Sequence, residues 1–251
     1  MNIVDAIIIA KNAENLLQDC LESLSFCTKI ILIDGGSNDN TVEIAKRHGA
    51  IVFEHKVQDF SEMRNFGLRK STAEWVFYID VDERVTEDLA GEIKKIVTAN
   101  EETHAAYKIK RKNFYLGKNA WPYIETLERL FRREKLQEWY GSLHESPRVK
   151  GTIGEIHGFL LHYTHRTLIE MLEKTITWSG VEAKLRFDAN HPKMTWWRFI
   201  RPMTGTFYEF FIRQGGWRVG TVGVIESIYQ VFSIFFTYAR LWELQQHDRK
   251  K

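Results

Sequence analysis

Four short apolar runs, rich in β-branched and aromatic side chains, recur through the first 80 residues of this 251-residue chain. They cover residues 3–10, 29–33, 50–53 and 75–79. Runs of this length and composition are typical of strands that are buried on both faces of a sheet. Polar segments long enough to form crossover helices separate the runs. The alternation predicts a doubly wound α/β fold, in which helices flank a mostly parallel sheet.

The segments between the runs repeat apolar residues at helical spacing. In the first segment Leu17, Cys20, Leu21 and Leu24 follow one another at intervals of three, one and three, which favours a helix with one buried face. Gly49 is a plausible stop for the second helix. The predicted helices cover residues 12–26, 41–48, 60–70 and 83–100.

Polar residues follow three of the predicted strands directly. They are Lys11 with Asn12, residues 34–37, and residues 80–83. Ligands of open parallel sheets bind at the carboxyl ends of the strands, so these three groups predict a binding site. Asp and Gly are also ordinary turn formers, which is the simpler interpretation of each group taken alone.

Asp80 and Asp82 form a D-x-D sequence immediately after the fourth run. In a turn after a buried strand, two such carboxylates project towards one point. Oxygen ligands of this kind suit Mg²⁺ or Mn²⁺ bound together with a diphosphate. The alternative is a structural turn that leads into the helix predicted from Glu83.

The second polar group reads Asp34-Gly35-Gly36-Ser37. Its glycines permit close approach of a ligand to the backbone, and Asp34 can accept hydrogen bonds from a base or a ribose. The group lacks the G-x-G-x-x-G spacing of a dinucleotide-binding loop, which disfavours NAD.

Four segments of the sequence form a set: AKNAE at 10–14, IDGGSNDNT at 33–41, MRNFGL at 63–68 and YIDVDER at 78–84. In order and spacing they resemble the motifs of inverting family 2 glycosyltransferases of the GT-A fold. Among the members of that family, the chain is similar to lipopolysaccharide core β-1,4-glucosyltransferase-like enzymes. The resemblance covers about residues 1–165.

This resemblance implies a UDP-sugar donor at the strand ends and assigns roles to several residues. Asp34 becomes a contact of the uracil or ribose, and Arg64 a contact of the phosphates or the base. Asp80 lies near the donor sugar and ribose, and Asp82 is a metal ligand. Ala13 stands where the family commonly has an acid, which leaves the role of Glu14 open. The remaining predicted donor-site residues are Lys11, Asn12, Gly36 and Ser37.

The acceptor side and the catalytic base are expected in the following residues, about 101–165. Inversion requires a base that deprotonates the acceptor hydroxyl as this attacks the anomeric carbon. The resemblance points to Glu145, about sixty residues beyond the D-x-D, with His144 as the neighbouring candidate. The simpler alternative for Glu145 is a solvated loop carboxylate.

Two further positions are candidates for the diphosphate and the metal. Residues 128–133 alternate charged and apolar side chains as a strand does, so Arg129 or Arg132 could meet a phosphate; Arg132 is included among the predicted donor-site residues. His162 occupies the place where many GT-A enzymes carry a C-terminal histidine ligand of the metal. A histidine satisfied within the core is the alternative for His162.

The last third of the chain is aromatic and basic. From residue 163 onward the sequence holds 13 Lys and Arg against 8 Asp and Glu, and five of the eight tryptophans. The whole chain carries a net charge of only +2, which does not indicate a nucleic-acid partner. Residues 163–186, 195–213 and 219–242 are predicted to be helical, with Pro202 breaking or starting a helix.

The last of these segments is long enough to cross a membrane, but its polar residues fall on one narrow stripe. Glu226, Gln230, Ser233, Thr237 and Arg240 are spaced by four, three, four and three residues. Because Glu226 in a lipid core would be costly, we expect helices that lie on the membrane or pack as a hairpin. The alternative is an aromatic helical cap on the catalytic domain.

The sequence therefore predicts a GT-A catalytic domain over 1–165, with a donor half at about 1–100, and a helical extension over 166–251. The predicted function is metal-dependent, inverting transfer from a UDP-sugar to a cell-envelope glycan or lipid-linked acceptor, with Mn²⁺ or Mg²⁺. The predicted location is peripheral, on the cytoplasmic face of the membrane. The alternatives are a non-catalytic membrane-associated module and, because D-x-D followed by Val85-Thr86 resembles a phosphatase loop, a haloacid-dehalogenase-type phosphatase.

Overall fold

The computed structural model describes residues 3–57, 59–99, 104–141 and 145–247. The chain divides into two compact units, which are described separately. The first comprises residues 1–112 with 125–162, and the second comprises residues 113–124 with 163–251. Residues 113–124 thus belong with the C-terminal helices, although they precede part of the first unit in sequence.

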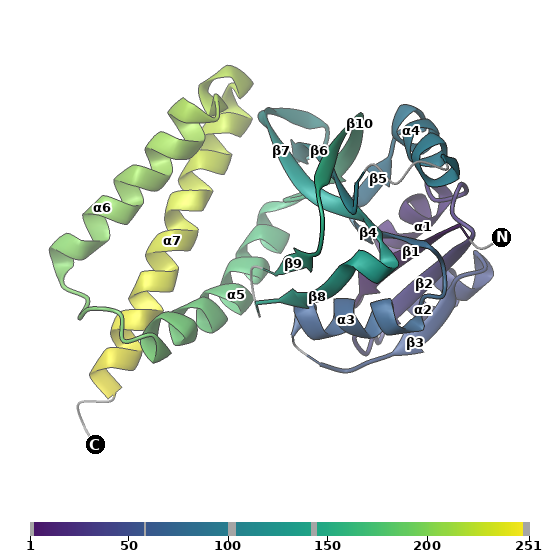
Figure 1. Ribbon diagram of the computed structural model, residues 1–251. Coiled ribbons are helices and arrows are strands. Elements are labelled where there is room, and N and C mark those ends of the chain that lie inside the picture. Colours follow the sequence, from purple (N-terminus) through teal and green to yellow (C-terminus); the bar gives the residue numbers. More distant parts are fainter. Residues whose placement is uncertain (1–2, 58, 100–103, 142–144, 248–251) are drawn as a thin grey trace. The chain divides into compact units, whose positions relative to one another are not determined.

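A mixed sheet of eight strands organises the first unit (Figure 1). Its order is β3-β2-β1-β4-β7-β6-β10-β5. The strands β3, β2, β1 and β4 are parallel to one another, and β7 joins β4 in the antiparallel sense. The parallel strands span β1 Val4–Ala10, β2 Lys29–Asp34, β3 Ile51–Glu54 and β4 Trp75–Asp80.

The other half of the sheet comes from residues for which the sequence analysis predicted few elements. Only residues 116–118 separate β6 from its neighbour β7, so this pair needs no crossover helix. Because β7 also joins β4 in the antiparallel sense, the sheet is mixed rather than mostly parallel. The strands β8 and β9 form a separate antiparallel pair. The spans are β5 Glu83–Val85, β6 Ala106–Tyr115, β7 Asn119–Arg132, β8 Leu136–Tyr140, β9 Ser146–Val149 and β10 Ile153–Tyr163, with a 3₁₀ turn η1 at Arg133–Lys135.

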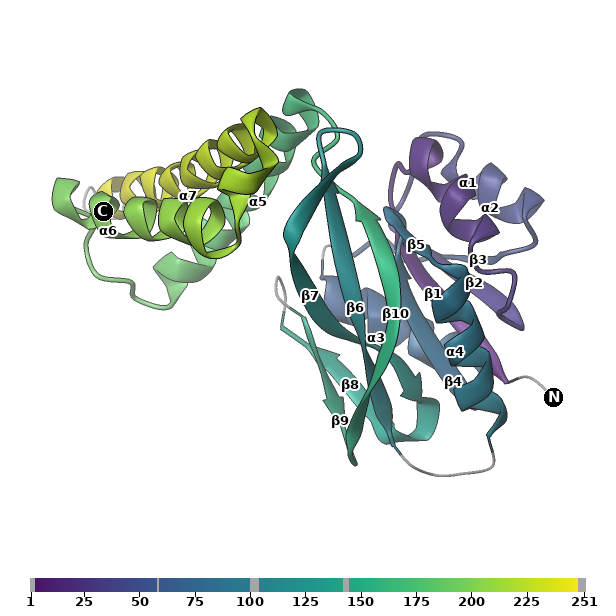
Figure 2. The ribbon, with the colours of Figure 1, turned by 90° about the horizontal axis from the view of Figure 1, so that it is seen from above.

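Helices cover both faces of the parallel strands (Figure 2). Alternate strand residues point to opposite faces, so Ile8 and Leu32 pack with α1 and α4 while Ile31 and Ile33 pack against α3. Both faces of the parallel strands are therefore packed with apolar side chains, which is why the strands are continuous apolar runs in the sequence. The helices are α1 Glu14–Glu22, α2 Thr41–Arg47, α3 Phe60–Lys70 and α4 Glu87–Thr98.

One predicted helix begins later than expected. Residues 83–85 form the short strand β5, which pairs with β10, and the α4 helix starts at Glu87 with Thr86 as its N-cap. The Thr86 hydroxyl accepts a hydrogen bond from the backbone N–H of Leu89 at 3.3 Å. Glu83 is consequently a fully buried strand residue and not the first residue of an exposed helix.

Within its described residues, the second unit consists of the adjoining ends of β6 and β7, three helices and the turns between these helices (Figure 1). Here α5 begins at Leu168 rather than at Tyr163, since Tyr163 ends β10. Pro202 lies inside α6, which continues through it. The spans are α5 Leu168–Asp188, α6 Trp196–Phe207, a π-helical turn η2 at Tyr208–Arg213, a 3₁₀ turn η3 at Gly216–Val219 and α7 Thr221–His247.

By length and composition α7 could cross a membrane, and within the described residues it is the one helix that could. Core helices of soluble proteins share this length and composition, so these two properties do not place α7 in a membrane.

Candidate active site

The parallel strands β1, β2 and β4 end at one edge of the sheet. Their register pairs Ala10 with Asp34 and Ile9 with Asp80, so the turns that follow these strands are neighbours. The predicted donor-site residues of the first two loops and the D-x-D sequence therefore share this edge.

Asp34 organises the loop after β2. Its carboxylate accepts hydrogen bonds from the Gly36 backbone N–H at 3.1 Å and the Ser37 hydroxyl at 2.6 Å. Gly36 has a φ of +86°, which glycine adopts without strain. The loop thus folds around a buried, ionisable side chain, and Asp34 is only 3% exposed.

The loop after β1 is tied to this Asp34 loop. The Asn12 backbone N–H donates to the Ser37 hydroxyl at 2.9 Å, and the Asn12 side-chain oxygen accepts from the Asn38 N–H at 2.8 Å. The Glu14 carboxylate accepts from both the backbone and the side-chain amide of Asn40. Asn12 and Glu14 therefore join the two loops, while the neighbouring Lys11 side chain is exposed.

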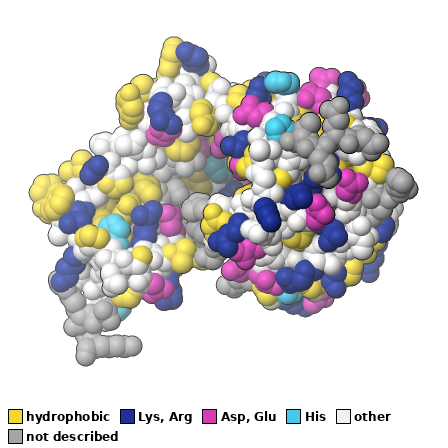
Figure 3. Space-filling model, viewed as in Figure 1, with side chains coloured by type: hydrophobic (Ala, Val, Ile, Leu, Met, Phe, Trp, Pro, Cys, Tyr) yellow, Lys and Arg dark blue, Asp and Glu magenta, His cyan; other side chains and the backbone are white. Residues whose placement is uncertain are grey.

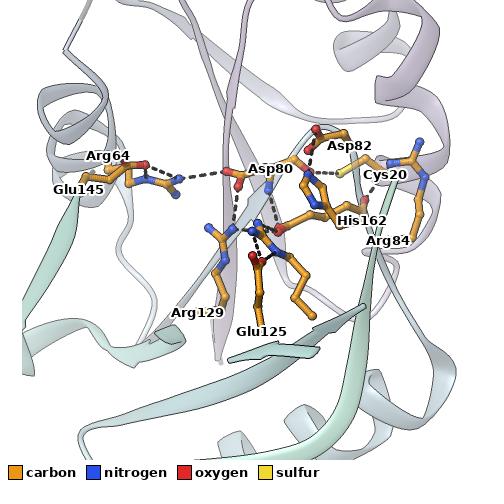
Figure 4. A network of polar contacts seen from close by, with 11 residues as sticks. Cys20, Arg64, Asp80, Asp82, Arg84, Glu125, Arg129, Glu145 and His162 are labelled. Atoms are coloured by element: carbon orange, nitrogen blue, oxygen red, sulfur yellow. Dashed lines mark hydrogen bonds and ion pairs between the residues drawn. The ribbon is translucent and has the colours of Figure 1, made fainter. Parts of the chain in front are cut away.

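Asp80 lies between two arginines (Figure 4). One carboxylate oxygen is 3.0 Å from Nη2 of Arg64, and the other is 2.6 Å from Nη2 of Arg129. Burial raises the pKa of Asp80, but the two guanidinium groups lower it by more, so the pKa lies well below the usual range of an aspartate. Asp80 is therefore an anion at any physiological pH.

A second acid, Glu83, supports this pair from inside the sheet. Its carboxylate accepts hydrogen bonds from Arg129 at 2.8 Å, from Arg111 at 3.0 Å and from the Asp80 backbone N–H at 3.0 Å. Arg111 also pairs with Glu125. Burial lowers the pKa of Arg129, yet Asp80 and Glu83 raise it further, which keeps the guanidinium charged.

Glu83 belongs to the polar group 80–83 that the sequence analysis placed at the binding site, but it was assigned no role there and was expected to begin a helix. Arg111 and Glu125 were not among the predicted site residues. They lie on strands that the sequence analysis did not assign, and alternating charged residues, the available signal for such strands, were noted only at residues 128–133.

Arg64 connects Asp80 to Glu145. Its guanidinium donates from Nε to Oε1 of Glu145 at 3.0 Å, while Nη2 contacts Asp80. The Arg64 guanidinium lies over the Trp139 ring at 4.8 Å from its centroid. The side-chain amide of Asn65 donates to the Trp139 carbonyl oxygen and accepts from the Trp139 backbone N–H. The helix α3 and the strand β8 together fix this arginine, which is 7% exposed.

The predicted metal ligands also lie together. Nε2 of His162, from β10, is 3.1 Å from Oδ2 of Asp82, in the turn after β4 (Figure 4). The antiparallel pairing of β10 with β5 places His162 opposite Glu83, which brings the histidine to the D-x-D turn. The described residues contain no group of three or more His, Cys, Asp or Glu placed to hold a metal ion.

Two protein ligands nevertheless suit a divalent cation that binds with its substrate. Mg²⁺ and Mn²⁺ in nucleotide sites commonly take one or two protein ligands, with the remaining positions filled by phosphate oxygens and water. A carboxylate beside an imidazole, at the edge where the parallel strands end, fits this pattern.

One predicted residue does not join the site, and another cannot be placed. Arg132 pairs in register with Trp75, at the amino end of β4, and forms an ion pair with Glu74 at 2.9 Å. Asp80 is at the other end of the same strand, so Arg129 reaches it and Arg132 does not. His144 lies outside the described residues.

Four parallel strands that end in this edge, extended by antiparallel strands of which β10 carries His162, make up the GT-A fold, and Glu145 lies just before β9 of the separate β8-β9 pair. The crystal structure of residues 1–349 of S. aureus TarS has a similar fold, with a TM-score of 0.50 and 13% sequence identity over 98% of this chain and 91% of that one.

The chain belongs to glycosyl transferase family 2, whose family model matches residues 5–150. Over 98% of its length it is 27% identical to the lipopolysaccharide core biosynthesis glycosyltransferase LpsC of Rhizobium meliloti, of which the match covers 94%. It is also 25% identical to an uncharacterised glycosyltransferase of Rickettsia typhi, over 99% of this chain and 90% of the relative. It is therefore a glycosyltransferase, as the sequence motifs predicted.

Proposed function

We propose that this glycosyltransferase is metal-dependent and inverting, and that it transfers a sugar from a UDP-sugar to a hydroxyl group of a cell-envelope glycan or lipid-linked acceptor. Similarity to LpsC along nearly the whole chain supports an acceptor of the lipopolysaccharide core type. The observation that carries the proposal is the pair of contacts made by Arg64. The Arg64 guanidinium binds Asp80, on the donor side, and also Glu145, which lies 81 residues after Arg64 in the chain.

In this proposal Glu145 is the catalytic base. It takes the proton of the acceptor hydroxyl while the oxygen bonds to the anomeric carbon and the bond from that carbon to the diphosphate breaks. Arg64 keeps Glu145 close to Asp80 and therefore close to the donor sugar. Arg64 and Arg129 offset the negative charge that a diphosphate brings beside Asp80.

Asp82 and His162 would hold the divalent cation. When bound, Mn²⁺ or Mg²⁺ supplies charge stabilisation for the departing diphosphate. Asp34 and the loop that it organises would receive the uracil and ribose. The helical unit would place the enzyme peripherally on the cytoplasmic face of the membrane.

One set of variants tests the metal site and the base separately. UDP binding in the presence of Mn²⁺ is measured by calorimetry, and UDP release from candidate UDP-sugars is measured with and without acceptor. Asp82→Asn and His162→Ala should weaken Mn²⁺-dependent UDP binding about ten-fold or more. Glu145→Gln should bind UDP and Mn²⁺ as the wild type does, but lose transfer by a factor of 10² to 10⁴.

Near-normal transfer by Glu145→Gln would rule out its role as the base. Glu43→Gln, an exposed carboxylate on α2, is the matched control and should leave both measurements unchanged. If no UDP-sugar is turned over with Mn²⁺ by the wild type, the non-catalytic alternative gains support. The phosphatase alternative has lost its basis, because the D-x-D sequence follows the fourth strand of a family 2 transferase domain.

A further inference from the structure

The helix α7 turns its polar stripe inwards. Glu226 and Thr237 are buried, and the Glu226 carboxylate is 3.0 Å from Nδ1 of His165 and 2.7 Å from the side-chain amide of Gln230. Arg240 donates to the backbone carbonyl of Ile176 in α5 at 2.7 Å. The polar stripe of α7 therefore packs against the rest of the helical unit.

The opposite stripe of α7 is apolar and exposed. Its five large side chains are between 40% and 56% exposed. At 100° per residue they occupy about 80° of the helix circumference, and the stripe is about 27 Å long at 1.5 Å per residue. It contains no charged side chain. The residues are Val224, Ile228, Phe232, Phe235 and Trp242.

Aromatic side chains of the preceding segment are exposed as well. Trp196 is 79% exposed, and Trp197 and Trp217 are more than half exposed. Arginines stack on two of them, with Arg198 at 4.9 Å from the Trp197 ring and Arg218 at 5.0 Å from the Trp217 ring. In Figure 3 hydrophobic side chains reach the surface of the helical unit among Lys and Arg side chains.

This arrangement is the reverse of that in a water-soluble helical bundle. Tryptophans paired with arginines are typical of the boundary between acyl chains and headgroups. The excess of basic residues from residue 163 onward complements an anionic leaflet. A second copy of this chain would bring the same excess of positive charge to the contact, which disfavours it as the occupant.

A crossing of the membrane by α7 conflicts with its packing on α5. The residues Glu173, Lys174 and Lys184 are exposed on α5, and α7 binds α5 through Arg240 and through Tyr229, whose hydroxyl donates to the Met171 carbonyl. If α7 crossed the bilayer with α5 attached, these charges would enter the hydrocarbon, which is costly.

We infer that the stripe of residues 224–242 is the membrane-docking face of the enzyme, and that α7 lies in the plane of an anionic bilayer surface with this stripe towards the acyl chains. This inference rests on the proposed peripheral location and adds the face and the orientation to it.

Flotation with lipid vesicles tests the docking face. The wild type should float with vesicles that contain phosphatidylglycerol, and less with pure phosphatidylcholine. Ile228→Glu/Phe232→Glu should lower the partition coefficient about ten-fold or more, since two exposed apolar groups are replaced by anions. The matched control is Ile51→Glu/Ile153→Glu, which changes two equally exposed isoleucines of the first unit and should float as the wild type does.

Circular dichroism and thermal unfolding establish that both double variants remain folded. Equal flotation of the wild type and Ile228→Glu/Phe232→Glu would overturn the inference. So would a wild-type dimer in lipid-free buffer that this variant converts to a monomer, because the face would then bind a second copy. Asp82→Asn should float normally, so a failure of the metal site and a failure of the docking face give different results.

The orientation is tested by the depth of nitroxide labels at Ile228→Cys and Trp242→Cys, each in a Cys27→Ser background. If α7 lies in the plane, lipid-soluble and water-soluble relaxing agents should report the same depth for both labels. In a spanning helix the two labels would differ in depth by about 21 Å, from 14 residues at 1.5 Å each. Such a difference would overturn the in-plane arrangement.

Discussion

At the scale of single residues, the candidate site depends on buried charges that neutralise one another. Asp80 and Glu83 face Arg64, Arg129 and Arg111, and removal of one partner leaves an uncompensated charge in a buried place. Glu83 touches neither the predicted donor nor the predicted metal position. It holds Arg129 and the Asp80 backbone in place, so we regard it as a positioning residue.

Glu83→Gln keeps the size of the side chain and removes its charge. We expect the free energy of unfolding to fall by about 3 kcal/mol, the usual cost of breaking a buried ion pair. Urea denaturation at neutral pH measures the change. Glu43→Gln should stay within about 0.5 kcal/mol of the wild type, as exposed substitutions do. An unchanged urea midpoint for Glu83→Gln would show that the charge of Glu83 does not stabilise the fold.

At the scale of elements, α3 determines where Arg64 lies, and α3 begins at a specific cap. The Asp59 carboxylate accepts hydrogen bonds from the backbone N–H groups of Ser61 at 2.8 Å and Glu62 at 3.2 Å. The Ser61 hydroxyl, which also donates to it, is the main reason that the pKa of Asp59 is lowered. Because the folded pKa lies below the unfolded pKa, the stabilisation is complete above the unfolded value and is lost as the pH falls through the folded one.

Asp59→Ala should therefore cost about 1 kcal/mol of unfolding free energy at pH 7, and less once the pH falls below about 4. Urea denaturation of both proteins at several pH values measures this difference. Asp59→Asn retains a capping oxygen but loses the charge, so at pH 7 it should cost less than Asp59→Ala, and this cost should also shrink as the wild-type carboxylate is protonated. A cost for Asp59→Ala that does not change with pH would mean that the carboxylate charge is irrelevant to the cap.

At the scale of the whole molecule, the first unit contains every described residue of the candidate donor and metal site, and it also contains Cys20. This thiol is fully buried, its Sγ lies 3.6 Å from the Asp80 carbonyl oxygen, and burial raises its pKa above the usual range of a cysteine. Its reaction with a thiol reagent therefore requires the unit to open, which makes labelling of Cys20 a measure of ligand binding to the folded state.

In a Cys27→Ser background, UDP with Mn²⁺ at 100 times its dissociation constant should slow the labelling of Cys20 about 100-fold. That factor corresponds to about 2.7 kcal/mol of stabilisation by a ligand that binds only the folded state. Mass spectrometry of the labelled fraction over time measures it. In Asp82→Asn, whose affinity for UDP with Mn²⁺ is expected to be about ten-fold or more lower, the protection at the same concentrations should fall to about ten-fold or less. Equal labelling rates with and without UDP and Mn²⁺ would contradict binding at this site.

The parallel half of the sheet, its helices and the acidic edge could be predicted from the sequence alone. These features depend on local patterns: apolar runs, helical spacing, and polar residues placed directly after strands. The motifs that carried the family resemblance, such as the D-x-D at Asp80 and Asp82, are likewise contiguous in the chain. Register then brings such contiguous groups together, because parallel strands end at the same edge.

Only the tertiary structure decided the partners of distant charges. The sequence does not show which of Arg129 and Arg132 reaches the site. The antiparallel pairing of β7 with β4 brings Arg129 to Asp80 and places Arg132 at the opposite end of β4. The sequence showed that the polar residues of α7 form one stripe, but it did not show whether that stripe faces the protein or the solvent. A helical wheel gives the spacing of polar residues, whereas the side chains packed against them, such as His165 against Glu226, decide which face is turned inwards.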